Sequence, residues 1–235
     1  MSNNYRQPLY LKKRGKSNDI FLLIVEGRNT ESLYFKKLKG LRGRGSSIRI
    51  EIESSDGGDI KKMLKNARQQ IIKSKDKRDI RNVPLKKVYI VIDRDRFANT
   101  IDSGIGLQHL REGVASITAK EPIEIILSAP NFEYWYLLHF CDRKPSDSNK
   151  VIEMLEKHLK DNNILDAQQH YSKNEGETKK MLDKFLEITD IVKAIDNATK
   201  IANQYEDDKC DRFDRDPYTE VHNLIKILGL DKTNE

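Results

Sequence analysis

The chain has 235 residues, of which 37% are hydrophobic and 34% are charged, and it contains two cysteines, Cys141 and Cys210. This composition excludes fibrous and low-complexity proteins, and it provides neither a disulfide framework nor the C-x-x-C spacing of a zinc knuckle. No segment approaches the about 18 apolar residues that a membrane helix requires, and residues 1–15 lack the apolar stretch of a signal peptide, so we expect a reduced, cytoplasmic protein.

The charge is distributed unevenly along the chain. Residues 1–90 carry 23 Lys and Arg against 9 Asp and Glu, a net charge of +14, whereas residues 91–235 carry a net charge of −8. A basic half favours contact with a polyanion such as nucleic acid. Charged residues on helices also form ordinary solvated faces, and charge alone does not separate these two interpretations.

The first half alternates between predicted strands and helices. Residues 20–25 form a continuous apolar run, which is typical of a strand buried on both faces. A turn follows, and then a helix with Asn29 or Thr30 as its N-cap and Gly40 as its stop. The remaining elements are strands at 48–52, 88–92 and 123–127, with helices at 59–71 and 107–119. This order predicts an α/β fold, a mostly parallel four-stranded sheet flanked by helices.

The second half is predicted to be helical. Residues 130–133 open one helix, with Asn131 as its N-cap, and His139 on its apolar face is expected to be a core residue. The last helix has Pro217 at its first position and Gly229 at its end. We expect a basic, flexible segment at residues 1–18, an α/β domain at 19–145 and a helical extension at 146–235 packed on the same core.

Carboxylates follow two of the buried strands. Glu26 ends the strand at 20–25, and Asp93 and Asp95 end the strand at 88–92. In parallel sheets such ends share one edge, where ligands bind, and the i, i+2 spacing directs both aspartates to one side. Carboxylates about 4 Å apart repel by about 1 kcal/mol per pair in water, so a cation is expected. Oxygen ligands without His or Cys favour Mg²⁺ or Mn²⁺ over zinc, although acids after strands also simply cap helices.

Five short blocks stand in a recognisable order along the chain. They are Glu26-Gly27 with Thr30-Glu31, Asp93-x-Asp95, the segment 128–140, Tyr171-x-Lys173, and Asp216-Pro217 with Thr219 and Val221. In these blocks the chain resembles the RloB-like family of bacterial defence proteins. The core of that family is similar to the Toprim fold of topoisomerases, primases and OLD-type nucleases, so the resemblance implies a Toprim-like sheet.

The resemblance also implies a metal-dependent nuclease. Carried onto this chain, Asp93 and Asp95 are metal ligands, and Glu26 is a metal ligand or the general acid/base. Glu133, in the first turn after the fourth strand, completes this site or caps its helix, and we count it with the other three as catalytic. Glu31 supports a second ion, as in the OLD-type relatives, or only complements the helix dipole.

Basic side chains in the first half are the candidates for contact with a phosphate backbone. They are Arg42, Arg44, Arg49, Lys61, Lys62, Lys65 and Arg68. Lys173, in a polar connection between helices, either reaches a phosphate near the metal site or is a plain surface lysine. These residues recognise charge and not base sequence.

We therefore expect a Mg²⁺- or Mn²⁺-dependent endonuclease of antiviral defence by abortive infection, acting on RNA, tRNA included, ahead of DNA. One alternative is a non-catalytic nucleic-acid-binding or sensing subunit that works with an ATPase partner. Another is nucleotidyl transfer, although the chain contains no G-x-x-x-x-G-K phosphate loop.

Overall fold

The central strand is β1 (Asp19–Val25), in which every residue after Asp19 is buried. The computed structural model describes residues 19–42, 48–55, 60–75, 85–95, 108, 111–112, 114 and 120–231. The sheet has the order β2-β1-β3-β4-β5, where the other strands are β2 (Ile48–Ser54), β3 (Leu85–Asp93), β4 (Ile123–Ala129) and β5 (Tyr218–Thr219). The first four run parallel, and β5 adds an antiparallel edge to β4. The α/β class and the mostly parallel sheet are confirmed, with a fifth short strand that the sequence did not indicate.

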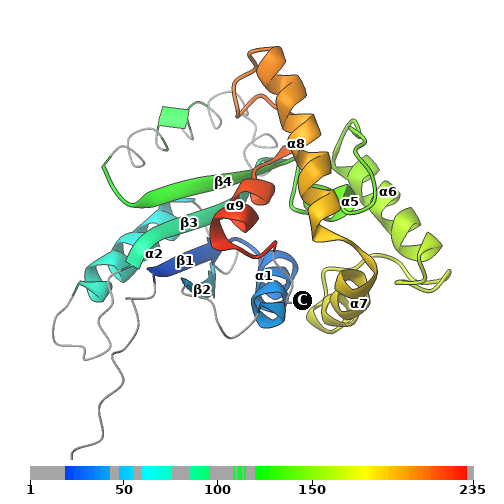
Figure 1. Cartoon of the computed structure of the whole chain (residues 1–235), viewed down its shortest axis with the longest axis horizontal. Helices are drawn as coiled ribbons and strands as arrows, with labels where there is room; N and C mark the ends of the chain where they lie inside the picture. The colour runs from blue at the N-terminus through cyan, green and yellow to red at the C-terminus, as the bar shows by residue number, and fades with distance from the viewer. Residues whose placement is uncertain are drawn as a thin grey trace, which may run out of the picture.

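Alternate residues of the strands face two separate layers of helix. Phe21, Leu23 and Val25 of β1 pack with α1 (Thr30–Leu41) and α9 (Val221–Leu228) on one face. Leu22 and Ile24 pack on the other face with α2 (Ile60–Ser74). Burial on both faces explains the uninterrupted apolar run of β1. The resulting arrangement is a sheet between two helical layers (Figure 1).

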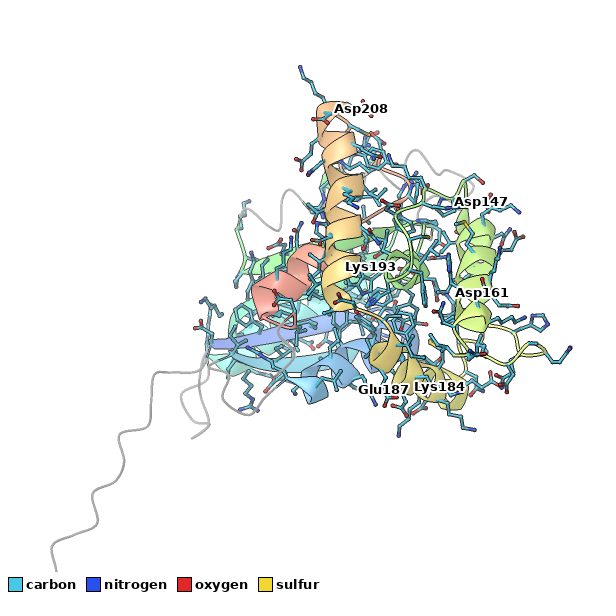
Figure 2. All side chains as sticks on the ribbon, turned by 45° about the vertical axis from the view of Figure 1, so that its right-hand side comes forward. Asp147, Asp161, Lys184, Glu187, Lys193 and Asp208 are labelled. Carbon is cyan, nitrogen blue, oxygen red and sulfur yellow. The ribbon has the colours of Figure 1, made fainter. Side chains whose placement is uncertain are left out.

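Four helices gather beyond the carboxyl end of β4 (Figure 1). They are α5 (Glu133–Leu138), α6 (Ser148–Asp161), α7 (Glu175–Ile188) and α8 (Ile191–Asp207). Charged residues of α6, α7 and α8, among them Asp161, Lys184 and Lys193, lie on the outer surface (Figure 2). Their apolar residues join the cluster that includes β1 and α1, so the predicted extension shares a core with the sheet.

Several predicted helix ends differ from the structure. Asn131 is not an N-cap, because α5 starts at Glu133 with Phe132 before it in helical conformation and without a side-chain cap. Pro217 does not open the last helix: it follows a cis peptide bond and leads into β5, and α9 begins at Val221. Gly40 lies inside α1, whereas Gly229 does end α9, with a left-handed φ of 59°.

Some predicted segments lie outside the described residues. The basic segment 1–18 is one of them, and within 107–119 only Gln108, Arg111, Glu112 and Val114 are described, all helical. Of the described helices, none combines the length and apolar character needed to cross a membrane.

His139 is a buried core residue that links α5 to α1 and α7. The Thr189 hydroxyl donates to Phe185 O (2.7 Å), so its oxygen accepts the His139 Nδ1–H at 3.0 Å, and Nε2 accepts from the Tyr34 hydroxyl at 3.0 Å. Burial lowers the pKa of His139 to about 3. The imidazole is therefore neutral in the folded protein.

We expect His139 to make folding sensitive to mild acid. In the unfolded chain His139 binds a proton near pH 6.5, whereas in the native protein it stays neutral down to about pH 3. Stability is therefore lost as pH falls below 6.5. Between pH 7 and 5 the free energy of unfolding should fall by about 2 kcal/mol more in the wild type than in His139→Gln. Urea unfolding at both pH values measures this difference, and parallel profiles for the two proteins would refute it.

Candidate functional site

The strand order places a topological switch point between β1 and β3. The chain leaves β1 for β2 on one side, while β3 and β4 lie on the other side. In open parallel sheets, ligands bind at such a point, outside the carboxyl ends of the strands. Glu26 follows β1 and Asp93 ends β3, and the Asp93 N–H donates to Glu26 Oε2 at 3.4 Å. The two predicted acids therefore meet where a ligand is expected.

The turn that carries Asp93 and Asp95 is held by β4. The N–H groups of Arg94 and Asp95 donate to Ser128 O (2.8 Å) and Pro130 O (3.0 Å). The Ser148 hydroxyl, at the start of α6, donates to Asp95 Oδ2 at 3.3 Å. Asp93 Oδ1 is buried and has no hydrogen-bond partner among the described residues. One carboxylate oxygen of this turn is therefore left for a ligand.

Glu31, in the first turn of α1, adds a further acid, which is buried. Its side chain is 4% exposed, and its carboxylate lies against the Cα of Gly27, in the space that any larger side chain at position 27 would fill. A Cβ at position 27 would collide with Glu31 Oε2, so a larger residue there would displace the Glu31 carboxylate. The glycine of the Glu-Gly pair therefore leaves room for this neighbouring acid.

Glu133 is the most deeply buried of these acids. It is fully buried at the start of α5, and its Oε1 accepts from the Tyr171 hydroxyl (3.0 Å) and from Lys173 Nζ (2.9 Å). Its Oε2 is buried without a partner among the described residues. Asn29, the N-cap residue of α1, donates to Lys173 O at 2.8 Å. The connection between α6 and α7 is thereby fixed beside the carboxylates.

Neighbouring acids contribute to raised pKa values of Asp93 and Glu31. Burial raises the pKa of Asp93 well above its usual range, and Glu31, Glu133, Glu26 and Asp95 raise it further. Burial also raises the pKa of Glu31 to about 7, with Glu133 and Glu26 adding to the effect. Burial alone would lower the pKa of Lys173, but Glu133 and then Asp93 and Glu31 raise it above its usual value. We define the carboxylate cluster as Glu26, Glu31, Asp93, Asp95 and Glu133. Within it, burial and neighbouring negative charge disfavour the ionised forms of Asp93 and Glu31.

The chemistry of the cluster fits a hard divalent cation. Its donors are carboxylate oxygens, and Asp93 Oδ1 and Glu133 Oε2 are buried without hydrogen-bond partners in the described part of the chain. Within those same residues, no three His, Cys, Asp or Glu side chains lie together in a group that could hold a metal ion. A bound Mg²⁺ or Mn²⁺ would therefore be held by some of these carboxylates together with water, as is usual for Mg²⁺.

The predicted nucleic-acid-binding residues do not form one group. Arg42 follows α1 and contacts Ile48 O, Arg49 is the second residue of β2, and Arg68 pairs with Glu121, which precedes β4. These arginines lie toward the amino ends of the strands, about 20 Å from the opposite edge for strands of this length. Lys61 and Lys62 begin α2 after the carboxyl end of β2, Lys65 lies one turn further on, and Arg44 is outside the described residues.

Tyr171 and Asn29 are site residues that the sequence did not assign. Tyr171 donates to Glu133, and burial and Glu133 raise its pKa, so the phenol keeps its proton. Asn29 holds the backbone of Lys173 instead of capping its own helix with its side chain. The Tyr-x-Lys block could have indicated Tyr171 as a site residue. Nothing in the sequence indicated Asn29, which has the position and residue type of an ordinary N-cap.

A family model described as "RloB-like protein" matches residues 21–228 of the chain. No curated protein and no solved structure shows a significant match. The matched range contains every residue of the carboxylate cluster, together with Tyr171 and Lys173.

We expect Glu31→Gln to stabilise the metal-free protein at alkaline pH. The native pKa of about 7 lies above the usual value of 4.5, so the wild type loses stability as pH rises between these values, and Gln has no such loss. In the presence of a chelator, the unfolding free energy of Glu31→Gln relative to wild type should rise by about 2–3 kcal/mol between pH 5 and 8. Glu187→Gln, on the exposed surface of α7, is the control and should show no such rise.

Proposed function

The chain belongs to the RloB-like family, and from this membership and the carboxylate cluster we propose that it is a divalent-metal-dependent endonuclease. The observation that carries the proposal is the gathering of mutually repelling, buried and half-buried carboxylates at the β1–β3 switch point. Structural ion pairs bring opposite charges together, whereas this cluster concentrates like charges at the edge where parallel sheets bind ligands. Perturbed acids in such a place favour a functional site over helix capping.

Asp93 and Asp95 are the proposed metal ligands, with Glu26 as a further ligand or the general acid/base and Glu133 completing the site. When bound, a divalent cation would neutralise charge on a phosphodiester and activate water for its hydrolysis. Lys173 is well placed to contact a phosphate, because its side chain is 58% exposed while its ammonium contacts the buried Glu133. Tyr171 fixes the position of Glu133 through its hydroxyl, and Asn29 fixes the backbone of Lys173.

For the substrate and setting, the resemblance supports RNA, tRNA included, ahead of DNA, and a role in antiviral defence. We propose that the protein acts in the cytoplasm, where its free cysteines stay reduced. The rival function is a nucleic-acid-binding or sensing subunit that works with an ATPase partner. That rival requires binding without cleavage, so an assay on the purified protein separates the two.

We expect the purified protein to cleave RNA or DNA with Mg²⁺ or Mn²⁺ and to be inactive with a chelator. Asp93→Ala should reduce the rate at least about 100-fold, the order of loss seen when an electrostatic stabiliser is removed. Asp161→Asn, an exposed carboxylate on α6, is the control and should retain activity. Labelled RNA and DNA substrates resolved on denaturing gels measure this, and binding without cleavage of either would favour the sensing subunit.

The position of the basic residues predicts which of them bind the substrate. Lys61 and Lys62, after the carboxyl end of β2, share the edge of the carboxylate cluster, whereas Arg49 and Arg68 do not. Replacing both lysines with Ala should weaken RNA binding and reduce the slope of log K against log salt by about 2. The matched variant Arg49→Ala/Arg68→Ala removes the same charge and should bind as the wild type does. Fluorescence anisotropy over a range of salt concentrations distinguishes them.

A further inference from the structure

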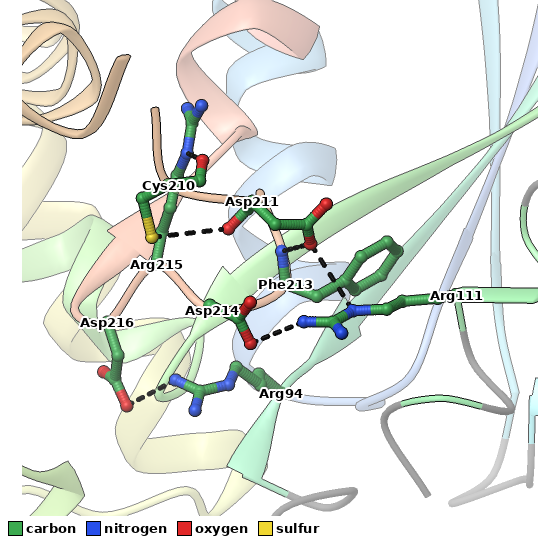
Figure 3. A network of polar contacts seen from close by, with 8 residues as sticks. All are labelled: Arg94, Arg111, Cys210, Asp211, Phe213, Asp214, Arg215 and Asp216. Atoms are coloured by element: carbon green, nitrogen blue, oxygen red, sulfur yellow. Dashed lines mark hydrogen bonds and ion pairs between the residues drawn. The ribbon is translucent and has the colours of Figure 1, made fainter. Parts of the chain in front are cut away.

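Arg94 is a nearly buried positive charge between two candidate metal ligands. It stands between Asp93 and Asp95 in the turn after β3, and its side chain is only 16% exposed. Its guanidinium points to the segment before β5, where Nη1 lies 2.5 Å from Asp216 Oδ2 (Figure 3). Arg94, which is adjacent in sequence to two acids of the cluster, is thus paired with Asp216, a carboxylate 122 residues further along the chain.

Asp216 is held in place by the same stretch of β4 that holds the turn of Arg94. Asp216 leads through Pro217 into β5, and β5 pairs with β4 at Ser128 and Ala129. The hydroxyls of Ser128 and Thr219 are 2.9 Å apart, and Ser128 O accepts the Arg94 N–H at 2.8 Å. Both partners of the ion pair are therefore anchored to one segment of the sheet, which fixes the direction of the guanidinium.

A guanidinium with little exposure requires a carboxylate partner, because its charge is costly to bury alone. If Asp216 lost its charge, the carboxylates nearest to Arg94 in sequence would be Asp93 and Asp95. These belong to a cluster with an excess of negative charge, which would attract the guanidinium. An arginine paired with these aspartates would occupy the candidate metal ligands, and its positive charge would oppose binding of a divalent metal ion.

We propose that Asp216 is a positioning residue for the metal site: by pairing with Arg94 it keeps the guanidinium away from the carboxylate cluster and leaves the cluster available to a divalent cation. This inference rests on the proposed function for the identity of the site. It assigns to the segment before β5 a role in metal affinity in addition to its contribution to the sheet.

The same segment contains a matched control. Asp214 pairs with Arg111 at 2.5 Å, and Asp211 lies 3.4 Å from the same guanidinium (Figure 3). The Asp214 side chain is 54% exposed, and Arg111 is separated from the Asp93–Asp95 turn along the chain. Removing Asp214 therefore breaks an ion pair of this segment without releasing an arginine beside the candidate ligands.

The test is titration of the full chain with Mn²⁺ alone, without nucleic acid, using the electron paramagnetic resonance signal of free Mn²⁺. Asp216→Ala should weaken Mn²⁺ binding about tenfold, the effect of one positive charge about 6 Å from a divalent ion in a water-like dielectric. Arg94→Gln should bind at least as tightly as the wild type. The double variant Arg94→Gln/Asp216→Ala should regain wild-type affinity, and Asp214→Ala should not differ from wild type.

Rescue by the second substitution is the decisive measurement, because a merely structural role of Asp216 would leave the double variant as weak as Asp216→Ala. Three outcomes would each overturn the inference. They are a double variant that binds Mn²⁺ as weakly as Asp216→Ala, an Asp216→Ala variant that binds as tightly as the wild type, and an Asp214→Ala variant that loses as much affinity as Asp216→Ala. Wild-type Mn²⁺ binding that Asp93→Ala abolishes would in those cases leave the proposed metal site intact, whereas absence of any wild-type binding would overturn both. Asp216→Asn, which keeps the side-chain volume, replaces Asp216→Ala if the latter does not fold, as judged by circular dichroism.

Discussion

Buried negative charge at the carboxyl edge of the sheet is the constraint on which the rest of the structure depends. Carboxylates taken out of water are costly, and several together also repel one another. Among the groups that offset this cost are the Lys173 ammonium and Tyr171 hydroxyl on Glu133, the Asp93 N–H toward Glu26 and the Ser148 hydroxyl on Asp95. The remaining cost is expressed as the raised pKa values of Asp93 and Glu31.

An aromatic core beneath the cluster prevents the acids from moving apart. Tyr34 of α1 packs edge-on against Phe132 and Trp135, and its hydroxyl reaches His139. The Tyr136 hydroxyl donates to Thr30 O at 2.9 Å, which joins α5 directly to the first turn of α1. Glu31 and Glu133 are the acids at the starts of these two helices, so rigid packing below fixes their separation above. Precise placement of this kind is what a metal or phosphate site requires.

The sequence predicted that Glu26 lies next to the Asp93 turn, because the backbone of a parallel sheet places the carboxyl ends of its strands at one edge. It did not predict the contact of Glu133 with Tyr171 and Lys173, since nothing in local periodicity shows how a loop folds back over a distant helix. The cap assigned to Asn131 was wrong because Phe132 continues the helical conformation, while the Asn131 amide oxygen is buried without a partner among the described residues. The arginines were grouped by charge alone, although a βαβ crossover sends the end of α1 and the start of β2 to the opposite edge.

Lys173 lies between the buried Glu133 and solvent. Glu133 is fully buried beneath an ammonium whose side chain is 58% exposed, so the negative charge is deep and the positive charge is at the rim. A phosphate approaching from solvent would meet Lys173 before it met the repelling carboxylates, and a divalent cation would carry the charge that a single lysine cannot supply. This arrangement of charge, with a lysine outside and carboxylates inside, therefore suits a phosphate that binds together with a divalent metal ion. Sequestering Arg94 with Asp216 preserves that polarity, because an arginine within the cluster would replace the ion without replacing its chemistry.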